Sequence, residues 1–584
     1  MGKKVLVMVM ACLVVTALGL AACGPAVTTT PPTTTPPTTI PPTTIPPTTK
    51  PPVEEPKYGG VFNYVRSTDI LQFDEGYGSP WLTLTLHFTN EDLSQADWTK
   101  GPEGTNEISL NSYGFPGLTL SSPVLAESWE IPDDQTIVFH IRQGVHFHDK
   151  PPTSGRELTA DDVAFSIKRV FQLSNAYLRM AETNPQSVEV RDKYTVLVKG
   201  PAGEMIEPLL DGIRIMPRDM IEKYGDMRDW RNSCGTGPFI LDDYVSGASA
   251  TYIRNPNYWD RDPFHPQNKL PYLDGIKCLI IPDASTRIAA IRTGKSDYYQ
   301  SAWQDANSLI AAIPELKHIR YLTTAPNMIY MRLDTPGLPF RDLRVRQALA
   351  MAIDYKKMAD EYYGGNAEIL SYPIVPLAEF SYAYTPLDKL PQSIRELWEY
   401  HPDKSKQLLT AAGYPNGFKT EIVCYAAQVD LLSIIKAYWA AIGVDLKLDV
   451  REYGVYNSIQ SAKSHKEMLY RYGGLANPAR IHYARAGGPQ NASIVVDEYI
   501  EESVRFLGQN YFNETAKSQR IREVTLYTYD KCWVIQPPNP YTFVLWWPWV
   551  KGYNGETNVG YWNYDDFAKW IWLDQELKKK MTGR

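Results

Sequence analysis

The chain has 584 residues, 43% of them hydrophobic, and a formal net charge of -7. This length predicts about two to four domains or lobes with a sizeable core. The negative charge favours solubility and argues against nucleic acid as the main partner. Aromatic residues make up 12% of the chain, which is typical of large core side chains or, alternatively, of an aromatic ligand cleft.

The first 23 residues indicate export and anchoring. Two lysines precede an uncharged, mostly apolar run over residues 5–20, which is too short for a transmembrane helix and is typical of a signal peptide. Two alanines then precede Cys23, as in a bacterial lipobox, where the cysteine receives lipid and becomes the mature N-terminus. An ordinary signal peptide beside a cysteine is the alternative. We expect a lipid-anchored protein on the outer (periplasmic or extracellular) face of the cytoplasmic membrane.

A Thr/Pro-rich segment over residues 24–57 follows the signal. Pairs of prolines recur every five residues from 31 to 52, and the segment has almost nothing apolar to bury. Such a sequence predicts a disordered stalk of extended polyproline type, at ~3.1 Å per residue. A body on an anchored stalk would work near the membrane but off its surface.

The body begins at Tyr58 with a predicted strand over residues 61–65, entered through two glycines. Residues 129–131 and 136–141 form a predicted hairpin, because the second segment alternates apolar and polar side chains around a Pro-Asp-Asp-Gln turn. Thr159 and Asp162 have the spacing of a capping box and predict a helix start.

Helices and strands continue to alternate along the chain. Apolar spacing and terminal glycines predict helices over 285–292, 342–357, 404–412 and 432–442. A strand over residues 444–450 follows the last of these. The alternation predicts an α/β architecture.

Several segments resemble one family, the family-five extracellular solute-binding proteins, which serve peptide, nickel-chelate and related ABC importers. The matching segments lie in the family's order between about 58 and 450 and cover residues 59–62, 123–130, 139–149, 158–163, 235–239, 254–259, 339–349 and 411–418. Together they are highly specific, although most suit structural roles such as the turn glycines Gly235 and Gly237.

The resemblance implies a two-lobed periplasmic-binding-protein type II fold with an extra domain and a hinged cleft. Lobe I is expected at 58–80, 229–315 and 548–584, the extra domain at 81–228 and lobe II at 316–547. Ligand would bind between the lobes, and ABC permease subunits would recognise the closed form of the monomer. No cofactor is expected.

The resemblance also implies two cleft-facing regions. One follows the first strand and contains Phe73, Gly76, Tyr77, Gly78 and Trp81. The other contains Tyr470, Arg471 and Tyr472.

Peptide-binding relatives carry an aspartate near the second region that holds the ligand's amino terminus, and this chain has none between residues 470 and 485. Arg471, Arg480 and Arg485 instead offer donors for a carboxylate or another anion, with surface arginines as the equal alternative.

A dense aromatic run near the return to lobe I contains Tyr541, Phe543, Trp546, Trp547 and Trp549. Flat aromatic faces suit peptide side chains and equally sugar rings. Strand residues that fill a core are the alternative for at least half of them. A peptide or peptide-sized solute is therefore the expected ligand, with an oligosaccharide or a metal chelate as the alternatives.

An enzyme is the main rival class, but the sequence lacks a GxSxG elbow, an HExxH motif and a phosphate loop. Ser433 and Lys436 match the SxxK of penicillin-recognising enzymes without the two companion motifs, so we predict a protein that is not an enzyme. A binding protein that feeds a sensor instead of a permease is the other rival.

Histidine and cysteine side chains offer two further hypotheses. A zinc site at His140, His146 and His148 lacks an evident further ligand, so we expect structural or surface histidines and no metal. Four widely spaced cysteines remain in the body, and their spacing leaves open whether they form up to two disulfides: Cys234, Cys278, Cys424 and Cys532.

Overall fold

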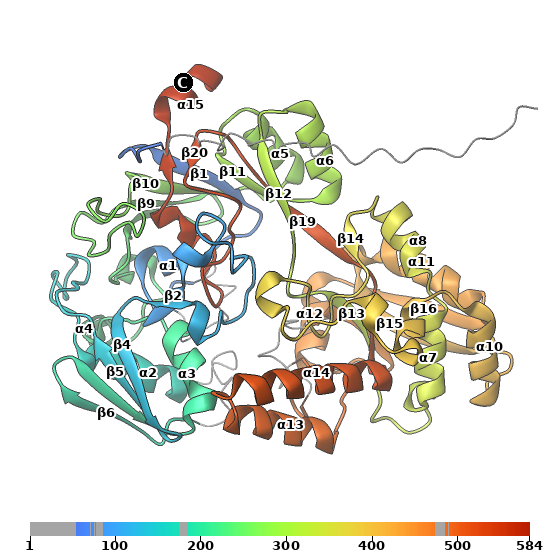
Figure 1. Cartoon of the computed structure of the whole chain (residues 1–584). Coiled ribbons are helices and arrows are strands. Elements are labelled where there is room, and N and C mark those ends of the chain that lie inside the picture. Colours follow the sequence, from blue (N-terminus) through green and yellow to red (C-terminus); the bar gives the residue numbers. More distant parts are fainter. Residues whose placement is uncertain are drawn as a thin grey trace, which may run out of the picture. The chain divides into compact units, whose positions relative to one another are not determined.

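The computed structural model describes residues 54–70, 72–74, 76, 86–173, 184–473, 485–488 and 490–583. From Pro56 onward the described residues form one unit (Figure 1). Within these ranges, no helix combines the length and the apolar character that a membrane crossing needs. The predicted signal, Cys23 and nearly all of the stalk lie outside the described residues.

The largest sheet has eight strands in the order β12-β19-β11-β1-β10-β9-β8, with β14 paired to β19. The strands are β1 (Val61–Arg66), β8 (Phe239–Val245), β9 (Ser249–Arg254), β10 (Gly275–Ile280), β11 (Tyr298–Ala302), β12 (Lys317–Leu322), β14 (Ala367–Glu368) and β19 (Asn539–Trp546). Figure 1 shows β19, in red, beside the green strands β11 and β12, with which it pairs antiparallel. Helices α5 (Ala284–Arg292), α6 (Trp303–Ala312) and α15 (Gln575–Thr582) accompany this sheet.

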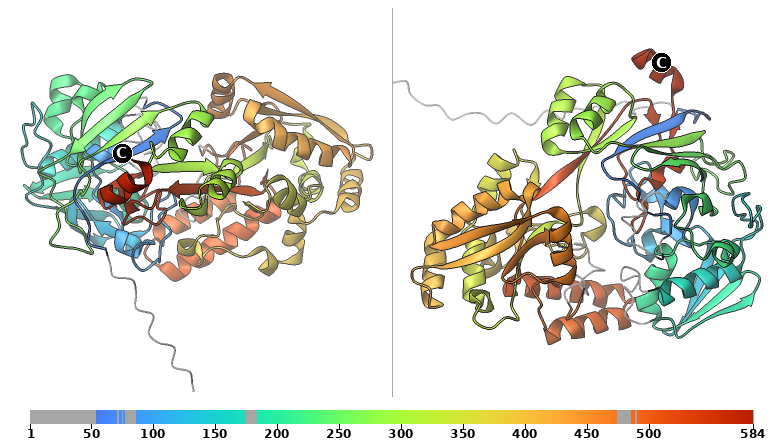
Figure 2. Two further views of the ribbon diagram at one scale, coloured as in Figure 1. Left: turned by 90° about the horizontal axis from the view of Figure 1, so that it is seen from above. Right: turned by 180° about the vertical axis from the view of Figure 1, so that it is seen from behind.

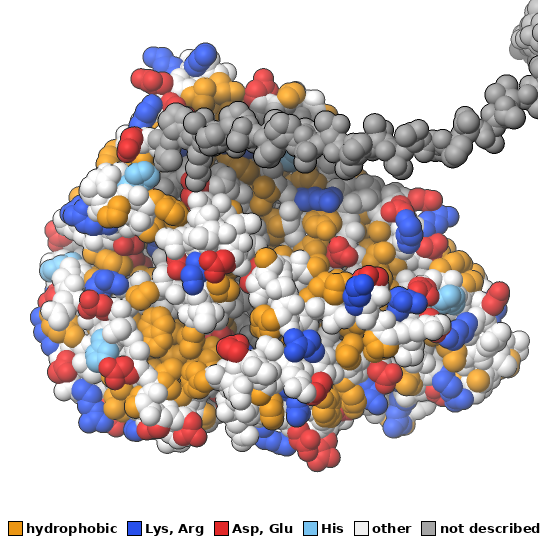
Figure 3. Space-filling view, in the orientation of Figure 1, with side chains coloured by type: hydrophobic (Ala, Val, Ile, Leu, Met, Phe, Trp, Pro, Cys, Tyr) orange, Lys and Arg blue, Asp and Glu red, His pale blue; other side chains and the backbone are white. Residues whose placement is uncertain are grey.

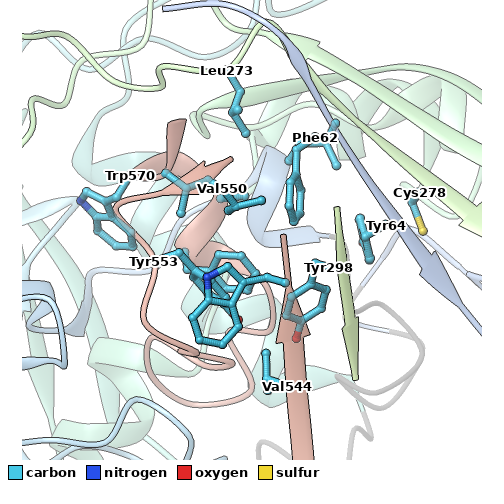
Figure 4. Packing of buried hydrophobic residues seen from close by; sticks show 14 of the residues in the cluster. Phe62, Tyr64, Leu273, Cys278, Tyr298, Val544, Val550, Tyr553 and Trp570 are labelled. Carbon is cyan, nitrogen blue, oxygen red and sulfur yellow. The ribbon is translucent and has the colours of Figure 1, made fainter. Parts of the chain in front are cut away.

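Aromatic side chains fill the core beside this sheet. Phe62 and Tyr64 from β1 lie near Tyr298 from β11 and Val544 from β19 (Figure 4). Tyr553 packs edge-on against Tyr298 with ring centroids 5.9 Å apart. Much of the high aromatic content therefore serves packing, because large rings contribute most of the buried apolar area of a core.

A second, five-stranded sheet has the order β16-β15-β17-β13-β18. Its strands are β13 (Asn327–Met331), β15 (Phe418–Tyr425), β16 (Val444–Arg451), β17 (Met468–Tyr472) and β18 (Val534–Ile535). Its helices are α7 (Leu343–Met351), α8 (Tyr355–Lys357), α9 (Gln392–Arg395), α10 (Pro402–Ala411), α11 (Val429–Ala440), α12 (Tyr453–Ala462), α13 (Glu498–Gln509) and α14 (Glu514–Lys531). Figure 2 shows α13 and α14 side by side.

A four-stranded antiparallel sheet is the third of the larger sheets, in the order β4-β5-β7-β6. Its elements are β4 (Ala126–Asp133), β5 (Thr136–Ile141), β6 (Ser187–Asp192), β7 (Thr195–Lys199), α2 (Ala160–Gln172), α3 (Ala202–Asp211) and α4 (Arg218–Tyr224). The predicted hairpin is confirmed, with Trp129 opposite Phe139. The predicted capping box is also present at α2, where the N–H of Thr159 donates to Oδ2 of Asp162 at 3.2 Å.

Short elements complete the fold: α1 (Leu86–Thr89), the pair β2 (Ser94–Ala96) and β3 (Ser121–Pro123), and the pair β20 (Val550–Lys551) and β21 (Trp572–Leu573). Gly235 lies against α1 so closely that a Cβ there would come within 2.0 Å of the carbonyl oxygen of Thr89. Close backbone approach, rather than a turn, is thus the reason for glycine at this position.

Two expectations differ from the structure in extent. The range expected for lobe II, 316–547, includes β12 and β19, and both belong to the sheet of β1. The single helix predicted over 342–357 is wrong, because α7 ends at Met351 and α8 begins at Tyr355. Asp354 separates them, since its carboxylate caps the second helix by accepting from the N–H of Lys357 at 2.9 Å.

Candidate functional site

Two short connections join the eight-stranded sheet to the five-stranded sheet. Residues 323–326 join β12 to β13, and residues 536–538 join β18 to β19. The side-chain amide of Asn539 donates to the carbonyl oxygen of Thr323 at 3.2 Å, so the two crossings lie side by side. Paired short connections of this kind are where a hinge can absorb backbone rotation.

Five rings gather beside the first crossing, and we call them the aromatic cluster: Tyr113, Phe115, Tyr561, Trp562 and Tyr564. The rings of Tyr113 and Trp562 stack with centroids 5.3 Å apart and an interplanar angle of 14°. Ala325 of the crossing packs against the cluster, and the N–H of Tyr113 donates to Oγ1 of Thr324 at 3.3 Å. The cluster thus joins two loops of the first sheet to the hinge.

Buried charge holds the loop that carries Trp562. The carboxylate of Asp211 accepts from the N–H of Tyr561 and from the amide of Asn563, both at 2.8 Å. Arg214 donates to the amide oxygen of Asn563 on the other side. Burial, followed by repulsion from Asp92, raises the pKa of Asp211 well above its ordinary value.

Trp562 has two properties typical of a functional position. Its φ of 55° lies in the left-handed region, which costs a non-glycine residue of order 1–3 kcal/mol and persists where neighbouring contacts hold it. Its indole N–H is also buried and has no hydrogen-bond partner among the described residues. An aromatic residue with a strained backbone and an unused indole donor is suited to meeting a ligand.

A small cavity lies between this region and the turn at residues 378–380. It measures about 10 Å³, and its lining includes Phe115 and Gly560 together with Glu379 and Phe380 of the turn. Oε1 of Glu379 accepts from the hydroxyl of Ser109 at 2.8 Å, and burial raises the pKa of this carboxyl. Since a water needs roughly 10–15 Å³, this conformer leaves room there for about one water molecule.

A second bridge joins the four-stranded-sheet domain to the segment after α13. The hydroxyl of Tyr511 donates to Oε1 of Glu207 at 2.6 Å. Gly203 on α3 approaches Gly508 on α13 so closely that a Cβ at residue 203 would lie 2.4 Å from the carbonyl oxygen of Gly508. The bond between Ser109 and Glu379 and the contact between α3 and α13 thus lie at two separate places, and both hold the five-stranded-sheet domain in this conformer.

The first predicted site region lies partly in the interior. Phe73 is buried and packs on Tyr244, with centroids 5.1 Å apart. The N–H of Gly76 donates to Asp74 at 2.9 Å, and a Cβ at Gly76 would meet Leu173 at 2.5 Å. Tyr77, Gly78 and Trp81 lie outside the described residues.

The second predicted region lies on β17. Tyr470 is buried in the core of the five-stranded sheet. Arg471 is also buried and donates to the carbonyl oxygen of Gln460 at 3.2 Å and to the amide of Gln490 at 2.6 Å. Its Nε is buried without a partner in the described part of the chain, so one donor of the guanidinium is unused. The guanidinium also lies over the ring of Tyr472, 5.0 Å from its centroid.

The other two arginines of that hypothesis differ in their surroundings. Arg485 pairs with Glu501 at 2.8 Å, an interaction within the same domain. Arg480 lies outside the described residues.

The predicted aromatic run follows β19 and mostly enters the first core. Phe543, Trp546 and Trp547 are buried, and Trp547 stacks on Trp549 with centroids 4.6 Å apart. Tyr541 is half-buried beneath the guanidinium of Arg320, and its hydroxyl donates to Glu368 at 3.3 Å.

Sequence reasoning missed the aromatic cluster. The segment around residues 561–564 contains three aromatic residues in four and follows a glycine, a signal comparable to that of the run at 541–549. Tyr113 and Phe115 give no such signal, because their pairing with residues 561–562 spans more than 400 residues of sequence.

The histidines of the zinc hypothesis and the serine of the SxxK match make ordinary structural contacts. His148 is buried beside Gly237, and burial lowers its pKa to about 4, whereas His140 and His146 contact Glu130 and Gly155. The described residues contain no group of three or more side chains arranged to hold a metal ion. The hydroxyl of Ser433 donates within α11 to the carbonyl oxygen of Val429 at 2.7 Å.

All four body cysteines are buried free thiols in the structure, so the open question of disulfides is answered: Cys234, Cys278, Cys424 and Cys532. Burial raises the pKa of Cys234, Cys278 and Cys424 to about 11 and that of Cys532 to about 12.

Comparison with known proteins gives consistent matches. Heme-binding protein A of Haemophilus influenzae is 31% identical over 379 residues, which cover 58% of this chain and 64% of that protein. The chain thus spans just under two thirds of this relative. The dipeptide-binding protein of Escherichia coli is 27% identical over 389 residues, covering 61% of this chain and 68% of the relative.

Solved structures agree on the fold. The ABC transporter-associated periplasmic binding protein DppA of Helicobacter pylori, in complex with a peptide, matches 89% of this chain and 99% of that chain with a TM-score of 0.68 at 22% identity. The oligopeptide-binding protein AppA of Bacillus subtilis covers the same share of this chain, and all of AppA, with a TM-score of 0.66 at 19% identity. The predicted α/β fold of oligopeptide-binding type is confirmed.

The family model for bacterial extracellular solute-binding proteins, family 5, matches residues 121–491. Its members are binding proteins rather than enzymes, in agreement with the prediction. By this match, which spans more than half of its length, the chain belongs to the bacterial extracellular solute-binding proteins of family 5.

Proposed function

We propose that this protein is the solute-capturing lipoprotein of an ABC importer, and that it holds a peptide or peptide-sized solute between its two lobes. The aromatic cluster beside the hinge carries the proposal, because it offers broad ring faces and the unused indole donor of Trp562. The unused Nε of Arg471 offers a charged donor on the second lobe. The lipid on Cys23 would keep the protein at the outer face of the membrane.

The proposal includes the lobe boundaries. Since β12 and β19 are strands of the first sheet, we place the second lobe between them, at residues 327–535, from which the short strand β14 reaches back to pair with β19. Relatives with dipeptide-, di/tripeptide- and glutathione-binding names support a peptide ligand, and the heme-binding relative names the main alternative class.

The test is a binding screen that separates these ligand classes. Thermal unfolding and calorimetry would be measured against dipeptides, tripeptides, glutathione, hemin, oligosaccharides and nickel chelates. A ligand at 100 times its Kd adds ~2.7 kcal/mol to the free energy of unfolding, which gives a clear rise in Tm. A response to peptides supports the proposal. A response to hemin, sugar or chelate alone contradicts the ligand class.

Variants test the site itself. Trp562→Ala is expected to weaken binding of the identified ligand by about tenfold or more, because stacking and an N–H donor are both lost. Tyr453→Ala removes an exposed tyrosine on α12 outside the aromatic cluster and is the matched control. Equal affinity of the Trp562 variant and the control would place the ligand elsewhere.

A further inference from the structure

A polar pocket lies away from the aromatic cluster, at the seam between the four-stranded sheet and the loop that joins β9 to β10. Its volume is about 650 Å³, within the range of small-molecule sites. Arg142 and Gln143 follow β5 on one side, and Trp259, Arg261 and Lys269 lie on the other. Against these three cations the lining contains one carboxylate, that of Glu127.

The floor of this pocket is built from fixed side chains. The guanidinium of Arg142 lies over the ring of Trp259, 4.5 Å from its centroid, and its Nε donates to the carbonyl oxygen of Val124 at 2.7 Å. The indole N–H of Trp259 donates to the buried carboxylate of Glu91 at 3.0 Å. Stacking and these bonds orient Arg142 before any ligand arrives, which lowers the entropic cost of binding.

Two residues of like charge stand opposite each other in the backbone at the rim. Arg261 and Lys269 pair in an isolated antiparallel bridge, where directly opposed like charges are destabilising. In the described part of the chain, no carboxylate oxygen lies within 4.0 Å of the charged nitrogens of Arg142, Arg261 or Lys269.

The carboxylates of the same loop are turned to other partners. Asp260 accepts from the N–H of Arg261 at 2.8 Å, and burial raises its pKa. Asp262 accepts from the hydroxyl of Tyr272 at 2.7 Å and contacts the ring of His265. The guanidinium of Arg261 donates to the carbonyl oxygens of Pro266 and Gln267, at 3.3 and 3.0 Å, but these acceptors carry no charge, so an external anion can still relieve the repulsion at the rim.

We propose that this pocket binds a phosphate group, either of a free phosphate compound or of a phospholipid headgroup. A phosphate dianion matches the excess of two positive charges in the lining, on a protein whose net charge is -7. Arginine fits two phosphate oxygens with its planar fork, and lysine adds a compact charge. The amides of Gln143 and Asn257 supply further donors at the rim.

Calorimetry on the full chain in mild detergent tests the site with three probes: inorganic phosphate, glycerol 3-phosphate, and glycerophosphoglycerol as a headgroup diester. We expect the first two to bind, and Arg261→Gln with Lys269→Gln together to weaken them by at least tenfold. The double variant is also expected to have a higher Tm than the parent in phosphate-free buffer, because the like-charge pair is gone. Lys277→Gln, an exposed lysine on β10, is the control and should leave binding unchanged.

The outcomes separate the sources. Binding of inorganic phosphate and the monoester glycerol 3-phosphate alone assigns a free phosphate compound, whereas equal binding of the diester assigns a lipid headgroup. Lack of binding by all three probes at millimolar concentration, or equal affinities of parent and double variant, would overturn the proposal. If the double variant fails to fold, Lys269→Gln alone gives the same comparison.

Discussion

At the scale of single residues, the buried carboxyl of Glu556 makes stability depend on pH. Its side chain is fully buried, one oxygen accepts from the N–H of Asn554 at 2.8 Å, and the other has no partner among the described residues. Burial raises its pKa from 4.5 to about 7. The folded state therefore holds this proton more tightly than the unfolded state. The stability that this provides is complete below about pH 4.5 and is lost as pH rises to about 7.

Glu556→Gln should remove this dependence. A pKa difference of this size corresponds to about 3 kcal/mol, so the free energy of unfolding should fall less between pH 5 and pH 8 in the variant than in the parent, by up to that amount. Urea unfolding at both pH values measures it. Glu502→Gln, at an exposed position on α13, serves as the control. Identical pH profiles of the Glu556 variant and the parent would contradict the prediction.

A buried ion pair carries the second residue-scale prediction. Arg169 on α2 forms two bonds to Asp74, at 2.9 and 2.7 Å, and Asp74 also accepts from the N–H groups of Gly76 and Met227. Asp74→Ala removes the carboxylate that neutralises the buried guanidinium and is expected to cost about 3–5 kcal/mol of folding free energy.

The double variant Asp74→Leu with Arg169→Met is the matched comparison. It should lose less stability than the single variant, since an apolar pair leaves no uncompensated charge. Denaturant unfolding of both variants decides the matter, and a more stable single variant would show that the pair does not act as a unit.

At the scale of elements, the contact between α3 and α13 depends on two glycines. Gly203→Ala would place its Cβ 2.4 Å from the carbonyl oxygen of Gly508, so the two helices must separate. Because this contact holds the five-stranded-sheet domain in the present conformer, we expect the variant to have a larger radius of gyration without ligand and weaker ligand binding.

Small-angle scattering and calorimetry give the two readouts. Gly454→Ala on α12 is the control, since its Cβ would meet only the flexible end of Glu452 at 3.0 Å. Unchanged scattering of the Gly203 variant would mean that the helices do not separate.

Elements with local signals were predictable from the sequence. The capping box of α2, the hairpin of β4 and β5, and the alternation of β16 each depend on residues within a few positions. The helix over 342–357 failed because its apolar spacing continues across Asp354, whose side chain starts a new helix instead.

At the scale of the whole molecule, the four free thiols report on global unfolding. They belong to three separate hydrophobic cores, and burial raises the pKa of each to about 11 or 12. Only a thiolate reacts rapidly, so a thiol reagent at pH 8 should label none of them in the native body and all four in urea. A variant with one thiol is labelled only when its own core opens. Fast native labelling would reveal a domain that opens separately.

The site was less predictable than the fold because it is assembled over long range. The resemblance led to the correct architecture and to residues of β17, and the density of aromatic residues led to those of β19. The ring stack of Tyr113 on Trp562 and the bonds from Asp211 to Tyr561 join segments far apart in sequence, which no local pattern encodes. The aromatic run at 541–549 left two readings open in the sequence, and in the structure most of its side chains pack in the first core, which was the alternative stated for at least half of them.

The pairing of β12 with β19 has a consequence for protein engineering. These strands are antiparallel neighbours with Leu322 opposite Tyr541, so the chain leaves the first sheet and returns to it at adjacent points. Everything between them is, in topological terms, an insertion into the turn of a β-hairpin. A short turn in place of residues 324–539 would close the hairpin, and the same position would accept the corresponding segment of a relative as one exchangeable module.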